Sequence, residues 1–246
     1  MALPTENVEL PSKGLLYPLD NPLSSGVVEM KYMTAKEEDI LSNQNYIKNG
    51  TVFDKLLKSL IVSKINYDDL CVGDKNAILI AARILGYGKD YQVKVPHPIT
   101  GEEEIVTIDL AELKNREVDY SLCKNINEFT YKLPKSENEI TFKILTHKDE
   151  RSIDDELKGL KKINLSAEVT TRLKHAILAV NGDREKKAIR EFIDNYLLAS
   201  DAQALRNYIK TVSPDLDLTF TFNGSDGYTQ EGVDIPMGVS FFYPNT

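Results

Sequence analysis

Two stretches of the chain decide the fold: Val28-Glu-Met-Lys-Tyr-Met-Thr-Ala-Lys-Glu-Glu38 and Ile140-Thr-Phe-Lys-Ile-Leu-Thr-His-Lys-Asp-Glu150. Lys, Thr, Lys and Glu recur in both at one constant offset, and apolar residues coincide at three further positions. In each stretch an alternating strand leads to a threonine, Thr34 or Thr146, which is followed three residues later by an acid. This order predicts a strand that ends where a helix with a capping box begins.

The correspondence continues on both sides of these stretches. Each strand is preceded by another that ends in Leu-Pro, and each capped helix is followed by an amphipathic helix, a Gly-Asp pair and a further helix. The apolar residues of the amphipathic helices recur at spacings of three and four, which puts each set on one face. The two sets are Val52, Phe53, Leu56, Leu57, Leu60 and Ile61, and Val169, Leu173, Ala176, Ile177 and Val180.

The remaining segments complete the two halves. Asp74 and Asp183 of the Gly-Asp pairs suit helix N-caps, and Ser200 with Gln203 predicts a capping box for a helix over 201–212. Alternating patterns predict strands at 91–95, 105–110, 216–222 and 233–243.

The order of elements predicts an α+β fold of two tandem diverged repeats, each a small antiparallel sheet with three to four helices. The expected first repeat covers residues 5–120 and the second covers 126–246. The alternative is a pair of unrelated α+β halves whose helix caps converge.

Composition narrows the class of protein. The chain has 246 residues, of which 41% are apolar and 28% charged, and its net charge is −8; these values are typical of a globular protein. The acidic balance disfavours binding to nucleic acid or to a membrane surface. Cys71 and Cys123 form no Cys-x-x-Cys motif and are expected to be reduced thiols. The start of the chain lacks a signal-peptide pattern, so we expect a location in a cytoplasm or in a particle assembled there.

Few motifs point to chemistry. Gly86-Tyr-Gly88 follows a helix instead of preceding one, so it is expected to end that helix and not to bind phosphate. The histidines, His97, His147 and His175, lack metal-ligand spacing and are expected at the surface or rim. Asp215 and Asp217 could share one strand face and hold a divalent metal. No partner ligand or calcium-loop spacing accompanies this pair, so we predict no catalytic, cofactor-binding or metal-binding residue.

The aromatic run Ile235–Pro244 predicts a terminal edge strand that is covered by its own domain or by a partner. Partner binding should map to what the two halves do not share, which is the loop 12–26, the turn 96–104 and this terminal strand. The residues expected to bind a partner are Tyr17, His97, Met237, Phe241, Phe242 and Tyr243.

Several of these segments also carry a family resemblance. The chain resembles the baseplate hub assembly proteins of T-even-like contractile-tailed phages through Leu10-Pro-Ser-Lys-Gly14, Tyr32–Leu41, Gly73–Arg83 and Phe242-Tyr-Pro244. Some relatives carry paired cysteines after the Gly-Tyr-Gly segment. Here Pro96-His97-Pro98-Ile-Thr-Gly101 has none, so no zinc is implied.

The resemblance implies a non-enzymatic protein that helps to build the central hub of the tail baseplate. It would act as a hub component or as a chaperone for hub and tape-measure proteins, and it could form a homo-oligomer. It would work in the host cytoplasm during assembly, and afterwards it would either leave or stay in the virion tail baseplate. The alternatives are a metal-dependent enzyme that uses Asp215 and Asp217, and a protein-interaction module unrelated to phage tails. A nucleic-acid binder is disfavoured by the acidic charge.

Overall fold

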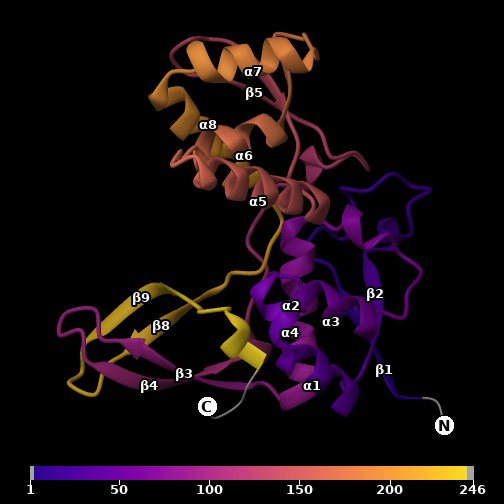
Figure 1. The fold of residues 1–246 in the computed structure, drawn as a ribbon, viewed down its shortest axis with the longest axis vertical. Helices are drawn as coiled ribbons and strands as arrows, with labels where there is room; N and C mark the ends of the chain where they lie inside the picture. Colours follow the sequence, from indigo (N-terminus) through magenta and orange to yellow (C-terminus); the bar gives the residue numbers. More distant parts are fainter. Residues whose placement is uncertain (1–2, 243–246) are drawn as a thin grey trace.

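The computed structural model describes residues 3–242 and shows two lobes and an arm (Figure 1). The chain mixes helices with small antiparallel sheets. The lower lobe is formed by the first part of the chain, and the upper lobe by residues 126–212. Within residues 3–242, no helix has the length and apolar character needed to cross a membrane.

The lower lobe packs helices against one β-hairpin. Its strands pair antiparallel, and Ile61 bridges back to Met30 of the second strand. The elements of this lobe are β1 Thr5–Glu9, β2 Val27–Lys31, α1 Ala35–Ser42, α2 Gln44–Lys48, α3 Val52–Leu60 and α4 Val72–Tyr87. As predicted, α4 ends at Gly88, whose φ of 82° is a backbone conformation that favours glycine.

The upper lobe contains a three-stranded sheet with helices around it. The strand order is β5-β6-β7, and both pairings are antiparallel. The elements are β5 Phe129–Lys132, β6 Glu139–Phe142, α5 His147–Lys162, α6 Glu168–Ala176, β7 Ile177–Val180, α7 Lys186–Asn195 and α8 Ala199–Val212.

The arm is made of two hairpins that are far apart in the sequence and side by side in the fold (Figure 1). Its strands are β3 Asp90–Pro96, β4 Glu103–Asp109, β8 Thr219–Asn223 and β9 Thr229–Asp234, and a short 3-10 helix, η5 Val239–Phe242, follows. The backbone N–H of Ser225 donates a hydrogen bond to Glu104 at 2.9 Å, which links the two hairpins. The arm thus contains residues of both predicted repeats, 5–120 and 126–246, and that division stays a prediction.

The lobes are joined by backbone hydrogen bonds and by a cluster of polar side chains around His147. Val72 N donates to the carbonyl of Leu145 at 3.1 Å, and one apolar core runs through lower lobe, upper lobe and arm. At the junction the ring of His147 lies between Asp54, 3.1 Å from Nε2, and Lys75, 2.9 Å from Nδ1. The expectation of a surface histidine is therefore wrong for His147, because helices of the lower lobe cover it.

The capping boxes predicted at Thr34 and Thr146 are present. The Thr34 hydroxyl donates to Glu37 at 2.6 Å, and the Thr146 hydroxyl donates to Asp149 at 2.9 Å. In each lobe a lysine near the end of the preceding strand forms an ion pair with the acid of the capping box. Lys31 lies 2.9 Å from Glu37 in the lower lobe, and Lys143 lies 2.7 Å from Asp149 in the upper lobe. After α3 in the lower lobe and after α6 in the upper lobe, the chain returns to that strand.

The Gly-Asp pairs do not correspond in the structure. Gly73 lies inside α4, where a Cβ would meet the carbonyl oxygen of Pro214 at 2.0 Å, so the close approach of two segments requires glycine there. Gly182 instead lies in an open turn with φ of +84°. The predicted N-cap at Asp183 is wrong, because the residue before α7 is Glu185.

Three further expectations are corrected by tertiary pairing and packing. Residues 177–180, expected to continue a helix, form β7 because they complete the sheet next to β6. The terminal strand expected over 233–243 ends at Asp234, and η5 follows. The expected cap at Ser200 lies inside α8, which begins one residue earlier, after Leu198.

Candidate partner-binding pocket

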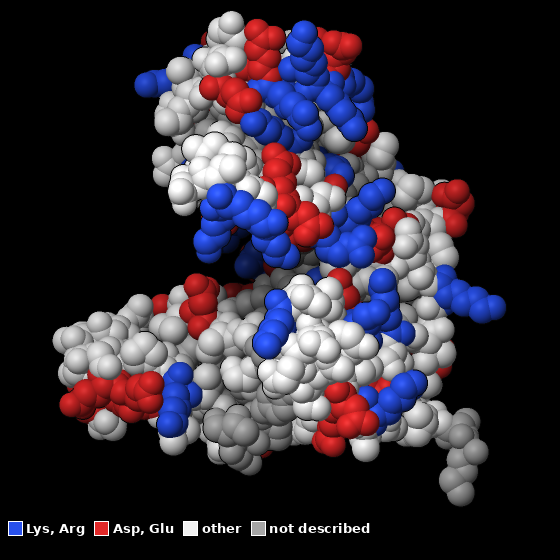
Figure 2. Space-filling model, viewed as in Figure 1, with Lys and Arg blue, Asp and Glu red and all other residues white. Residues whose placement is uncertain are grey.

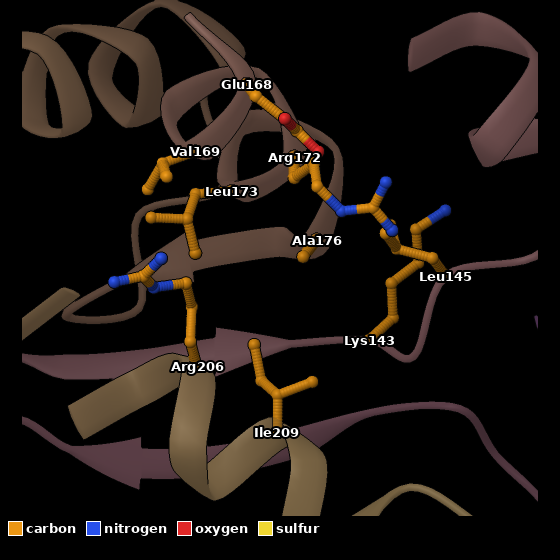
Figure 3. A pocket seen from close by; sticks show the side chains of 9 residues that line it. All are labelled: Lys143, Leu145, Glu168, Val169, Arg172, Leu173, Ala176, Arg206 and Ile209. Carbon is orange, nitrogen blue, oxygen red and sulfur yellow. The ribbon is translucent and has the colours of Figure 1, made fainter. Parts of the chain in front are cut away.

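A pocket of about 430 Å³ lies between α6 and α8 of the upper lobe (Figure 3). Leu173 and Ile209 point toward its centre, and Arg172 and Arg206 lie on opposite sides (Figure 3). The complete lining consists of Lys143, Leu145, Glu168, Val169, Arg172, Leu173, Ala176, Arg206 and Ile209. We call this site the α6–α8 pocket.

The local sequence explains why a space remains there. α6 is held over the sheet because it turns directly into β7, which pairs with β6. Its apolar residues recur at spacings of four and three, so they share one face. On that face Leu173 and Ala176 are buried, whereas the side chain of Val169 is 41% exposed. The small side chain of Ala176 leaves room at the floor, and Val169 forms an apolar edge open to solvent.

Charge around the pocket is mainly positive, and one cation lacks an acidic partner. Arg172 donates hydrogen bonds to Glu150, and Lys143 lies 2.7 Å from Asp149. Arg206 donates only from Nε, to the backbone of its own helix at 3.3 Å. Its terminal nitrogens have no ion pair or hydrogen bond within residues 3–242. A guanidinium with free N–H groups suits a carboxylate from another molecule.

A second cavity of about 390 Å³ is lined by the end of α6 and by α7, and it is strongly charged. Figure 2 shows Lys and Arg side chains gathered over this upper lobe. Several of these charges are already paired, as in Lys174 with Asp194 at 2.7 Å and His175 with Glu156 at 3.2 Å. The lining of the second cavity is therefore more polar than that of the α6–α8 pocket.

Tyr17, predicted to bind a partner, is buried inside the lower lobe. Its hydroxyl donates to Asp74 and accepts from Cys71 N at 3.0 Å, and the Ser12 hydroxyl also donates to Asp74, at 2.7 Å. Burial raises the pKa of the Asp74 carboxyl. The N-cap predicted at Asp74 is therefore wrong: this carboxyl instead fastens the loop 12–26 to α4.

His97 is buried as well, contrary to the expectation of a surface or rim position. Its ring centroid lies 5.4 Å from that of Phe222 and 5.1 Å from that of Tyr228. Both aromatic residues come from the second hairpin of the arm, which covers the turn of the first. His175 is half-buried at the side of α6, close to its expected position.

The aromatic residues at the end of the described chain face inward. Phe241 and Phe242 are each 1% exposed, and Met237 is half-buried against the same core. Tyr243 lies outside the described residues. In this conformation Phe241 and Phe242 are enclosed by their own chain, as are Tyr17 and His97, and the partner role predicted for these residues stays a prediction.

Asp215 and Asp217 have partners within the chain. Asp215 accepts a hydrogen bond from Asn76 at 3.2 Å and lies 3.7 Å from Arg116, and burial raises its pKa. Asp217 is exposed and accepts from Thr219 at 2.8 Å. Across the described part of the chain, no group of three or more His, Cys, Asp or Glu is placed to hold a metal ion. This arrangement gives the metal-enzyme alternative no support.

The residues that shape the pocket were not predicted as site residues. Val169 and Leu173 were recognised only as one face of an amphipathic helix, and Arg206 only as part of a predicted helix. The pattern of apolar residues shows that α6 has a face to bury. It does not show that α8 leaves this face partly uncovered, because that depends on contacts between distant segments.

The T4 bacteriophage base plate protein family matches residues 6–242. Comparison with curated proteins and with solved structures gives no match. The family match includes both lobes and the arm, so it applies to the whole fold described above. The chain therefore belongs to the T4 bacteriophage base plate protein family.

Proposed function

We propose that this chain acts without catalysis in assembling the central hub of the tail baseplate, and that it binds another tail protein through the α6–α8 pocket. Its family supports a structural role in the baseplate and a location in the virion tail. The finer role, as a hub component or as a chaperone for hub and tape-measure proteins, is part of this proposal. So is its action in the host cytoplasm before the tail is complete.

The observation that carries the proposal is the combination of apolar and charged groups at the pocket. Val169 is an exposed apolar side chain at the edge of the pocket, and beside it lies Arg206, whose terminal nitrogens have no partner within residues 3–242. Binding sites in proteins are typically concave, mainly apolar, and contain a few polar groups that orient the ligand. A protein segment with an apolar side chain near a carboxylate would satisfy both kinds of group.

The direct test is size-exclusion chromatography of the purified chain mixed with the hub and tape-measure proteins of the same phage. We expect co-elution with at least one of them. The Val169→Asp variant should lose the complex, because a charge would replace an apolar contact that becomes buried in it. Separate elution of every protein at concentrations well above micromolar would overturn the proposed function.

We also propose that the two lobes contain diverged copies of one unit. The shared features are the capping box, the lysine that pairs with its acid, and the return of the chain to the strand after α3 or α6. The Gly-Asp pairs and the later elements differ, so the proposed correspondence covers the part from the first hairpin to the returning segment.

A further inference from the structure

The lower lobe contains a helix face comparable to the α6–α8 pocket, and that face is covered. α3 and α6 have the same length, and the residue after each helix pairs with the strand that precedes the capped helix. When the two helices are aligned residue by residue, from the first to the last, Phe53 corresponds to Val169 and Leu60 corresponds to Ala176. Two residues that line the pocket thus have counterparts in the lower lobe.

An aromatic side chain packs on the edge of this face of α3. The ring of Phe242 packs against Phe53 with centroids 5.6 Å apart. The turn that carries it is fixed by Arg83, whose Nε donates to the carbonyl of Phe241 at 2.9 Å. The segment η5 therefore reaches α3 from a distant part of the chain, and it supplies the side chain that packs on Phe53.

The corresponding face of α6 receives no such aromatic residue from the described chain. α8 contributes Ile209 and the stem of Arg206, and a volume of about 430 Å³ remains. The substitution of alanine for leucine at the floor and of valine for phenylalanine at the edge enlarges the space. A space of this size is within the range of ligand-binding pockets.

We infer that the α6–α8 pocket accepts an aromatic side chain from a partner tail protein, with a neighbouring carboxylate of that partner bound to Arg206. This inference rests on the proposed function and specifies the chemistry of its partner. The aromatic residue would take the place on α6 that Phe242 takes on α3. The carboxylate would meet the guanidinium that lacks an acidic partner in the described chain.

A second copy of this chain is a poorer occupant. Its own aromatic turn is buried in its own core, where Phe241 and Phe242 are each 1% exposed. Presenting that turn to a neighbour would expose the apolar residues beneath it, which is unfavourable in water. A partner with an accessible aromatic-acidic segment carries no such penalty.

The test uses the full chain and a peptide that copies residues 234–242, Asp-Ile-Pro-Met-Gly-Val-Ser-Phe-Phe, with a free C-terminal carboxylate and an N-terminal fluorophore. Fluorescence anisotropy measures binding, and methyl NMR of the chain locates it. We expect signal shifts at Leu145, Val169, Leu173 and Ile209. Replacing both phenylalanines of the peptide by alanine should abolish binding.

Variants of the chain test the two parts of the site separately. Val169→Asp should weaken peptide binding by about tenfold or more, because a charge would be placed in an apolar contact. Arg206→Glu should also weaken it, and more strongly for the free carboxylate than for a peptide with an amidated end. Lys210→Glu is the matched control, since this exposed residue lies on the same helix outside the pocket, and binding should be unchanged.

The outcomes separate this inference from the proposed function. A complex with a tail protein that is lost in Val169→Asp, together with no peptide binding, would overturn the inference alone. So would a chain that dimerises through Val169 and excludes the peptide. Peptide binding at the pocket without any tail-protein complex would overturn the proposed function and support the chemical preference inferred here.

Discussion

Phe242 of η5 packs its ring against Phe53 of α3, with ring centroids 5.6 Å apart. This contact ties the end of the described chain to its first helices, because the aromatic turn lies among α3, α4 and the arm. The final segment is thus part of the core of the lower lobe.

Replacing Phe242 by alanine should lower the free energy of unfolding by about 3–5 kcal/mol, since it removes a fully buried aromatic ring and leaves a cavity. Urea unfolding followed by circular dichroism measures the change. Tyr196→Ala is the control, because this aromatic side chain is 63% exposed, and its effect should stay within about 0.5 kcal/mol. Equal stabilities of the two variants would contradict the burial of η5.

The buried guanidinium of Arg83 should be the main support of the η5 turn. It donates to the carbonyls of Phe241 and Gly88 at 2.9 and 2.8 Å. Arg83→Met keeps much of the side-chain volume but leaves these carbonyls unpaired, so we expect a loss of about 3 kcal/mol or more. Arg83→Lys should restore only part of it, because an ammonium lacks the planar fork. Hydrogen exchange should speed up at residues 239–242 before it does in α1, and unchanged exchange there would count against this role.

The Glu37 carboxyl should make the free energy of unfolding depend on pH. Burial raises its pKa, but hydrogen bonds led by that from Ser59 outweigh this effect and lower the pKa from 4.5 to about 2. A carboxyl with a lowered pKa in the folded state stabilises the protein above its unfolded pKa. That contribution is lost as the pH falls from about 4.5 toward 2.

Wild type should therefore exceed Glu37→Gln in stability near neutral pH by on the order of 3 kcal/mol. The difference should shrink steadily as the pH falls below 4.5. Urea unfolding of both proteins across this range measures it. A difference that stays constant with pH would show that the carboxyl is not held in its charged form.

The two capping boxes should have similar energetic weight if the lobes contain copies of one unit. Thr34→Ala and Thr146→Ala each remove a threonine hydroxyl that donates to the acid three residues on. Each should cost about 1 kcal/mol. Thr211→Ala, at an exposed site near the end of α8, provides a comparison without a cap. A cost at only one of the two caps would weaken the proposed duplication.

Local features were predictable from the sequence because their partners lie a few residues apart. The caps at Thr34 and Thr146 depend on an acid three residues away, and the glycine that ends α4 follows directly from its position after an apolar helix. The hairpin of β3 and β4 was likewise visible as two alternating segments around a turn.

Features that depend on distant partners were not predictable. His97 reads as a turn residue between two prolines, and its burial comes from Phe222, on another hairpin. Residues 177–180 continue a helical pattern, but pairing with β6 makes them a strand. The pocket was missed for the same reason, since Val169 and Arg206 come together only when α6 and α8 pack.

Calorimetric titration of the hub or tape-measure partner into the chain shows whether a tail protein binds at the α6–α8 pocket. Val62→Asp is the matched control for Val169→Asp, since the two valines are 47% and 41% exposed and Val62 lies in the lower lobe. We expect Val169→Asp to weaken binding by about tenfold or more and Val62→Asp to bind like wild type. Equal affinity of all three proteins for the partner would contradict it.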